Sequence, residues 1–152
     1  AVLHEEAGNV QASIADLREA VKLNPMIDEL RVSLLRYLLS IGDRDTDAVE
    51  VVEGVIKRRP GDLALLVNTG DIFREAGRID RAEDYYERAY KQSAQLFIVL
   101  RYLDLLQTRK PPALTKADEV LRTMGSAVDA EPSLLMSRAK QFAFRGRQEE
   151  AL

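Results

Sequence analysis

Two regularly spaced prolines constrain this chain more than any other feature of its sequence. Pro25 follows Leu23 and Asn24, and Pro60 follows Arg58 and Arg59, 35 residues further on. A unit of roughly 35 residues is typical of stacked helical hairpins, because two helices cannot bury their apolar faces alone and must pack on further copies. The spacing therefore predicts an all-α repeat protein.

The clearest copy of the repeat surrounds Gly77. Leu66, Gly70 and Phe73 precede this glycine, and small and aromatic residues follow it at Ala82, Tyr86 and Ala89. This unit resembles a tetratricopeptide repeat. Residues of similar type recur at matching positions before and after this unit, and three further glycines stand at the position of its turn. We therefore expect all four glycines to end helices. The three are Gly8, Gly42 and Gly146.

The resemblance covers essentially the whole chain and implies its organisation. We expect one repeat domain over residues 1–152, cut from a longer protein. Its parts are a partial repeat at 1–25, repeats at 26–60, 61–94 and 95–131, and a partial repeat at 132–152. Members of the family stack antiparallel helix hairpins into a right-handed superhelical solenoid, and the resemblance implies that fold here.

Apolar spacing predicts where the helices lie. Ala48, Val52 and Val55 fall on one stripe with Val51 and Ile56, so this valine-rich stretch is helical rather than extended. A second stripe combines Leu30, Leu34, Tyr37, Leu38 and Ile41. We expect helices near residues 10–23, 27–41, 46–58, 63–76, 79–92, 95–108, 114–128 and 132–145.

Composition and charge narrow the classes of partner. Hydrophobic residues make up 46% of the 152 positions, which is ample for a packed core. Charged residues make up 31%, but the net charge is only −3, so binding to nucleic acid or an anionic membrane has little support. Apolar runs are too short to cross a bilayer. The lack of cysteine fits a bacterial cytoplasm or periplasm, and we expect a bacterial source.

Residues for catalysis are missing from the sequence. His4 is the only histidine, and we find neither a nucleophile paired with a base nor a glycine-rich phosphate loop. Asp43, Asp45 and Asp47 resemble the opening of a calcium loop, but its later positions lack the required Gly and Glu, so we expect helix capping instead. We therefore predict no enzyme activity, no cofactor and no metal site.

The family resemblance implies where a partner would bind. Tetratricopeptide repeats usually grip a peptide or protein segment on a concave surface built mainly from the first helix of each repeat. Arg36, Arg101 and Lys140 occupy the same place in three first helices, and Arg74 lies one turn further along in another. These cations would hold carboxylates of a partner. The alternative is that they are simply solvated.

The second part of the predicted surface is apolar. Residues 96–100 are apolar all round, so we expect Phe97 and Ile98 to be exposed in a patch with three further residues. These are Leu105, Met136 and Phe144. The alternative is that the loop containing Pro111, or a second copy of the chain, covers them.

Asn68 resembles an asparagine that some family members use to bind a terminal carboxylate. However, Ala94 and Ile98 stand where those members place basic residues, so that clamp is disfavoured.

Together these features favour a non-catalytic scaffold that binds a peptide or protein segment in its groove. The alternative is self-assembly, in which copies stack end to end through apolar residues of the terminal helices. These residues are Leu3 at one end and Leu135, Ala139 and Phe142 at the other.

Overall fold

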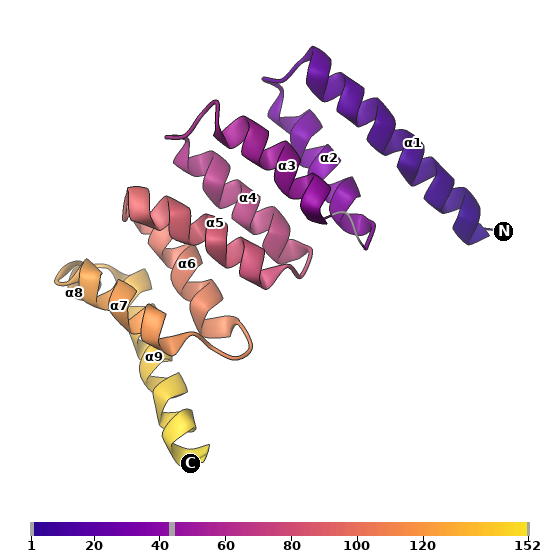
Figure 1. Cartoon of the computed structure of the whole chain (residues 1–152). Helices are drawn as coiled ribbons and strands as arrows, with labels where there is room; N and C mark the ends of the chain where they lie inside the picture. The colour runs from indigo at the N-terminus through magenta and orange to yellow at the C-terminus, as the bar shows by residue number, and fades with distance from the viewer. Residues whose placement is uncertain (1, 43–44, 152) are drawn as a thin grey trace. The chain divides into compact units, whose positions relative to one another are not determined.

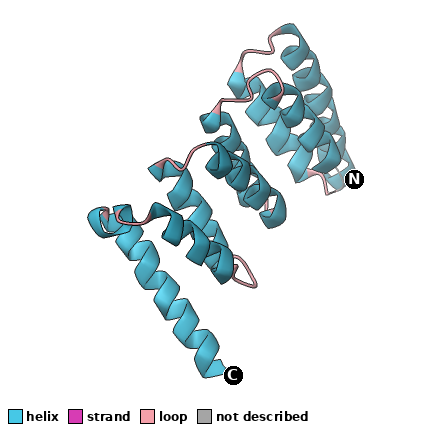
Figure 2. Cartoon of the chain, turned by 60° about the vertical axis from the view of Figure 1, so that its left-hand side comes forward, coloured by secondary structure: helices cyan, strands magenta, loops and turns pink. Residues whose placement is uncertain are grey.

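A computed structural model describes the backbone of residues 2–42 and 45–151 and the side chains of residues 8–42 and 45–150. Within these ranges the regular elements are all helices, joined by short loops (Figure 2). In chain order they are α1 (Val2–Leu23), α2 (Asp28–Ser40), α3 (Asp45–Ile56), α4 (Leu63–Glu75), α5 (Ile79–Gln92), α6 (Leu96–Thr108), α7 (Leu114–Met124), α8 (Ala127–Ala130) and α9 (Pro132–Ala151), as labelled in Figure 1.

The helices form two compact units. The first, Ala1–Arg78, contains α1 to α4, and the second, Ile79–Leu152, contains α5 to α9. The prediction of a single repeat domain over 1–152, with the repeat boundaries given above, stays a prediction.

The predicted helix positions are confirmed, with differences at three glycines. Two of the predicted turns are wrong: α1 runs through Gly8 and α9 runs through Gly146 without a break. A helical glycine costs only about 1 kcal/mol relative to alanine, and no proline follows closely to stop either helix. Conversely, the helix expected over 114–128 is divided into α7 and α8 at Gly125, whose φ is +55°.

Gly77 ends α4 as expected. Its φ is +78°, a left-handed conformation that residues with a Cβ adopt only at a cost. The amide of Arg78 donates to the carbonyl of Phe73 at 2.9 Å, and the amide of Gly77 donates to that of Arg74 at 2.9 Å. These bonds satisfy carbonyls that the end of the helix leaves free, as a left-handed glycine cap does.

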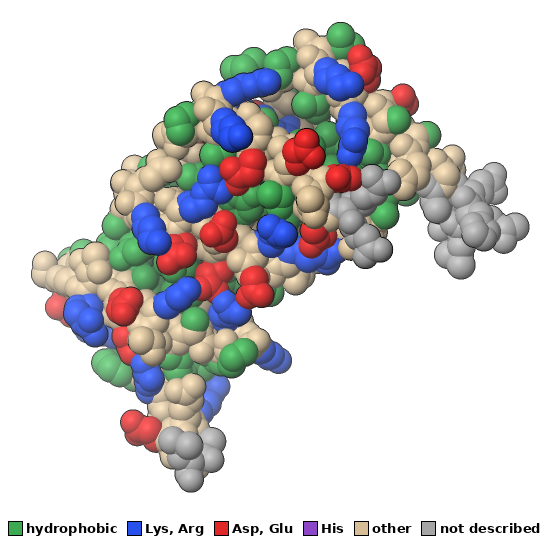
Figure 3. Space-filling model, viewed as in Figure 1, with side chains coloured by type: hydrophobic (Ala, Val, Ile, Leu, Met, Phe, Trp, Pro, Cys, Tyr) green, Lys and Arg blue, Asp and Glu red, His purple; other side chains and the backbone are tan. Residues whose placement is uncertain are grey.

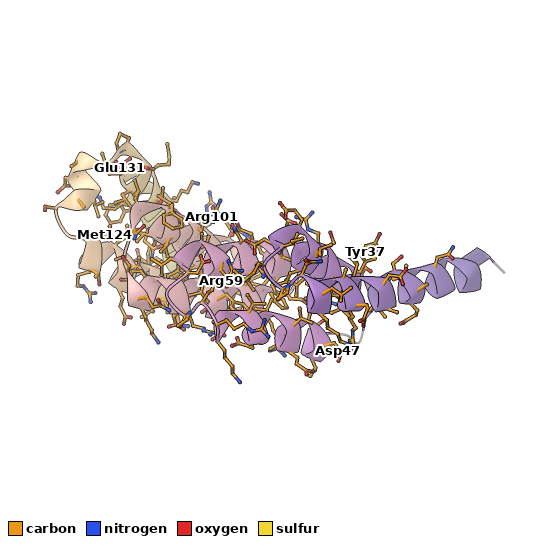
Figure 4. The ribbon with its side chains drawn as sticks, turned by 90° about the horizontal axis from the view of Figure 1, so that it is seen from above. Tyr37, Asp47, Arg59, Arg101, Met124 and Glu131 are labelled. Atoms are coloured by element: carbon orange, nitrogen blue, oxygen red, sulfur yellow. The ribbon has the colours of Figure 1, made fainter. Side chains whose placement is uncertain are left out.

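The first unit has an apolar core between α1, α2, α3 and α4. Leu34, Leu38 and Val52 are completely or almost completely buried. The stripe predicted on α2 is partly wrong, because Tyr37 is 41% exposed, whereas Arg31, Leu35 and Leu39 are buried. Seen from above, Tyr37 and Asp47 lie on opposite sides of this unit (Figure 4). Sequence spacing alone misjudged the direction of this stripe, since α2 packs against three helices rather than one.

The aspartates that open α3 form ion pairs between helices. An Arg78 Nε donates to Asp45 at 2.7 Å, and an Arg18 Nη2 donates to Asp47 at 3.2 Å. Asp43 lies outside the described residues. No cluster of three or more metal-ligating side chains occurs in the part of the chain whose side chains are described.

In the second unit, a buried carboxylate joins α5 to the chain that follows α6. Glu83 is 6% exposed and accepts hydrogen bonds from Arg109 and Lys116, while Arg109 also donates to Asp80 at 2.7 Å. The Ala113 amide donates to the Leu106 carbonyl at 2.8 Å. The loop between α6 and α7 is therefore tied to the first turns of α5.

Candidate functional site

The first part of the candidate site lies between α2 and α4, the opening helices of two successive hairpins, which pack side by side. A cleft of about 250 Å³ lies near their C-terminal ends. Arg36 lines this cleft, and its Nη2 lies 3.4 Å from Glu75 Oε2; its role in binding a partner stays a prediction. Both side chains are more than half exposed, so the pair is weak and remains open to exchange with a partner's charges.

A second, smaller cleft lies between the N-terminal halves of the same helices. Its volume is about 130 Å³, and Asn68 lies on its wall together with Arg31 and Asp62. Asn68 is exposed, and its role in binding a partner stays a prediction. The two clefts thus follow the α2–α4 contact one after the other.

Arg31 is the residue of this cleft that sequence reasoning missed. It is 3% exposed, and its Nη2 donates to Asp28 Oδ1 at 2.6 Å. The same oxygen accepts from Arg59 Nη2 at 2.9 Å. A signal was present, since Arg31 stands at the position of a core residue, one turn before Leu34 and Leu35.

The polar network around Arg31 leaves one donor unused. Arg31 Nη1 is buried and lacks a hydrogen-bond partner in the described part of the chain. The hydrogen bond from Arg59, followed by that from Arg31, lowers the pKa of Asp28 from its ordinary value of 3.8, so Asp28 is ionised near neutral pH. Arg31 therefore has a counter-charge but not a full set of acceptors.

The second part of the candidate site lies on α6 and α9, which pack together in the second unit. Gln107 Nε2 donates to the Ser137 carbonyl at 2.8 Å and to Gln141 Oε1 at 3.2 Å. These buried amides hold the two helices in register. Met136 precedes Ser137 on α9 and is 60% exposed, and Phe97, at the other end of α6 from Gln107, is 41% exposed; both were predicted to be exposed.

The predicted apolar patch is wrong at two residues. Ile98 is 0% exposed and Leu105 is 1% exposed, so neither can touch a partner. The reason is that α6 packs against three helices, α5, α7 and α9. These contacts bury a wider part of the α6 surface than a single apolar stripe would cover. Phe144 is half-buried, with the Arg147 guanidinium 5.6 Å from its ring centroid. The loop containing Pro111 is bound at α5 and belongs to the opposite end of α6 from Phe97.

The predicted cationic row is divided between the two units. Arg36 and Arg74 belong to the first unit, and Arg101 and Lys140 belong to the second. Arg36, Arg101 and Lys140 are exposed, and Arg74 is half-buried; Figure 4 shows Arg101 directed outward from α6. On the face drawn in Figure 3, basic and acidic side chains are interspersed rather than gathered into one basic patch. A continuous row through all four cations stays a prediction.

Three comparisons place this chain among known proteins. Residues 34–96, from α2 through α5, match the family model of the tetratricopeptide repeat. The mouse interferon-induced protein with tetratricopeptide repeats 3 is 23% identical over 108 residues, which cover 68% of this chain and 27% of the mouse protein. This chain thus spans about a quarter of that relative. No solved structure matches this chain. Within the described residues, none of the helices is long and apolar enough to span a membrane.

Proposed function

Because this chain is a tetratricopeptide-repeat protein over residues 34–96, we propose that it is a non-catalytic scaffold that holds a peptide or protein segment against the opening helices of its hairpins. Repeats of this family are in general protein-interaction modules. The observation that carries the finer proposal is the pair of clefts along the α2–α4 contact, with Arg36 at one and Asn68 at the other.

The exposed residues of α6 and α9 give the second unit an apolar surface of its own. Phe97 and Met136 are large, exposed side chains, and Phe144, on the same helix as Met136, is half-buried. Burying one such side chain fully contributes about 1.5 to 3 kcal/mol to binding. Ile98 takes no part, because the core already buries it.

The cations have a different role from the apolar residues. Arg101 and Lys140 are exposed on α6 and α9, and Arg36 and Arg74 lie on α2 and α4. Exposed charges change the rate and orientation of association more than its final affinity. We therefore expect a segment that binds at α6 and α9 to carry acidic as well as apolar side chains.

The experiment begins with peptides selected on the immobilised chain from a random displayed library. We expect Arg101→Glu to slow association of the selected peptides about tenfold and to flatten the dependence of the rate on salt. Arg81→Glu is the matched control, since Arg81 is an exposed arginine on α5, the second helix of its hairpin. Equal association rates for wild type and Arg101→Glu, at low and high salt, would count against the proposal.

A second candidate function is self-association through α9. Leu135, Ala139 and Phe142 stand at i, i+4 and i+7, and all three are exposed, Phe142 by 69%. An unpaired apolar stripe of this kind suits a second copy of the chain. Leu3, expected to contribute at the other end, has a side chain outside the described residues.

Sedimentation over a concentration series tests this candidate. We expect the wild type to associate as concentration rises and Phe142→Glu to remain monomeric, because a charge in the stripe cannot be buried without a partner. Phe97→Glu is the control, since it places the same charge on α6. If the wild type is still monomeric at the highest concentration, self-association is excluded. That outcome would not count against the proposal of peptide binding.

A further inference from the structure

The smaller cleft between α2 and α4 contains an unused hydrogen-bond donor. Arg31 lines this cleft, is 3% exposed, and has no acceptor for its Nη1. Buried polar groups are nearly always paired, so an unpaired guanidinium nitrogen beside a cleft needs an explanation. A group that enters the cleft and offers an oxygen would supply the missing acceptor.

The charges around the cleft determine what kind of oxygen this is. Asp28 and Asp62 line the cleft, and Arg31 and Arg59 bind them: Arg59 reaches Asp28 at 2.9 Å and Asp62 at 3.4 Å. Two cations thus face two carboxylates. Because the two carboxylates already neutralise the two cations, an incoming carboxylate would gain no net attraction to repay the cost of losing its water, and a neutral oxygen loses its water at a smaller cost. Arg31 therefore lacks a hydrogen-bond acceptor, although the cleft already contains two negative charges.

The size of the cleft limits the entering group to one small side chain. Its volume is about 130 Å³, well below the roughly 300 Å³ at which pockets for whole small molecules begin. Val32, Leu35 and Ile72 give it apolar walls, and the exposed residues Ala64 and Asn68 also line it. This is a subsite within a larger contact surface.

We propose that this cleft binds the primary carboxamide of an Asn or Gln side chain in the partner segment. The amide oxygen accepts from Arg31 Nη1 after a small rotation of the guanidinium toward the cleft, and the NH₂ group donates to the carboxylate of Asp28 or Asp62. Unlike a hydroxyl, in which one oxygen both accepts and donates, a carboxamide is a neutral side-chain group that carries its acceptor and its two N–H donors on separate atoms. This inference rests on the proposed function, because it names one side chain of the bound segment.

Small probes test the subsite without knowledge of the partner. We expect acetamide to produce saturable NMR shifts at the Arg31 Nε–H and the Asn68 amide of the full chain. Acetate should bind at least about tenfold more weakly, because of the two aspartates. N-methylacetamide mimics a backbone amide and therefore distinguishes a backbone carbonyl from a side-chain carboxamide. If it binds as tightly as acetamide, the cleft binds the partner's backbone, and the assignment to an Asn or Gln side chain is overturned.

A variant that closes the cleft completes the test. Ala64→Leu should remove the acetamide shifts while the remaining spectrum stays native, since Ala64 is exposed and leucine is a good helix former. Ala143→Leu, the same change at an exposed site on α9, should leave them intact. Absent or unsaturable shifts in the wild type mean that the cleft holds only water. If acetamide binds but no displayed peptide does, the carboxamide site is supported and the proposed binding of a segment is contradicted. If peptides bind but acetamide does not, the binding of a segment is supported and the carboxamide site is contradicted.

Discussion

At the scale of single residues, the glycines of this chain are not equivalent. Gly77 has a φ of +78°, whereas Gly54 lies inside α3 with an ordinary helical backbone and no atom within 4 Å of an added Cβ. Gly8 and Gly146 resemble Gly54, although their sequence positions resemble that of Gly77. Only the backbone conformation distinguishes a glycine that the fold requires from one that it tolerates.

Two alanine substitutions should therefore change stability in opposite directions. Gly77→Ala should lower the free energy of unfolding by about 1 to 2 kcal/mol, because alanine is strained at positive φ. Gly54→Ala should raise it by about 0.5 to 1 kcal/mol, because alanine loses less backbone entropy in a helix. Urea unfolding followed by circular dichroism measures both. Two changes of the same sign would show that one of the two backbone conformations is wrong.

At the scale of helices, short ion-pair networks fix how neighbouring elements meet. Asp28, in the first turn of α2, accepts from Arg59 in the segment between α3 and α4. Glu83 of α5 is bound in the same way by Arg109 and Lys116 from around the next loop. In both cases a carboxylate near a helix start holds a basic residue that follows the next helix: the pair of Asp28 and Arg59 closes the α2–α3 hairpin, and the pair of Glu83 and Arg109 ties α5 to the end of α6.

The lowered pKa of Asp28 predicts a pH dependence of stability. Asp28 loses its proton more easily in the folded chain than at its ordinary pKa of 3.8, so its stabilising contribution is present above about pH 4 and is lost as the pH falls through the folded value. Asp28→Asn should thus be less stable than wild type at pH 6, and this difference should shrink toward pH 2.

Chemical unfolding at several pH values measures the two curves. Asp84→Asn, which removes an exposed carboxylate from α5, is the control for loss of one negative charge. A gap between wild type and Asp28→Asn that stays constant from pH 6 to pH 2 would contradict the assigned network.

At the scale of the whole molecule, the chain is a series of helices that contact near neighbours. In the first unit α2 packs against α1, α3 and α4, and in the second α6 packs against α5, α7 and α9. Stability in such repeats is approximately a sum over units and their interfaces. The family match spans both units, since residues 34–96 include α4 and α5.

The sequence by itself indicated the tetratricopeptide-repeat pattern that the family model matches over residues 34–96, the all-helical class and most helix boundaries. These depend on short-range information: the recurrence of Pro25 and Pro60, the spacing of Ala82, Tyr86 and Ala89, and the turn at Gly77. Each of these features acts within one hairpin, where the period of the α-helix fixes which residues lie together. The exposure of Phe97 and Met136 was also predictable from this pattern.

Only the tertiary structure decided which side chains the neighbouring hairpins bury. Ile98 and Leu105 looked like surface residues, because one apolar stripe suffices for a helix with a single neighbour, yet α6 has three. Arg31 was not among the predicted site residues, yet it is buried beside Asp28 and lines the cleft between α2 and α4. Burial depends on the contacts that a helix makes with other helices. The spacing of apolar residues along one helix does not indicate how many other helices pack around it.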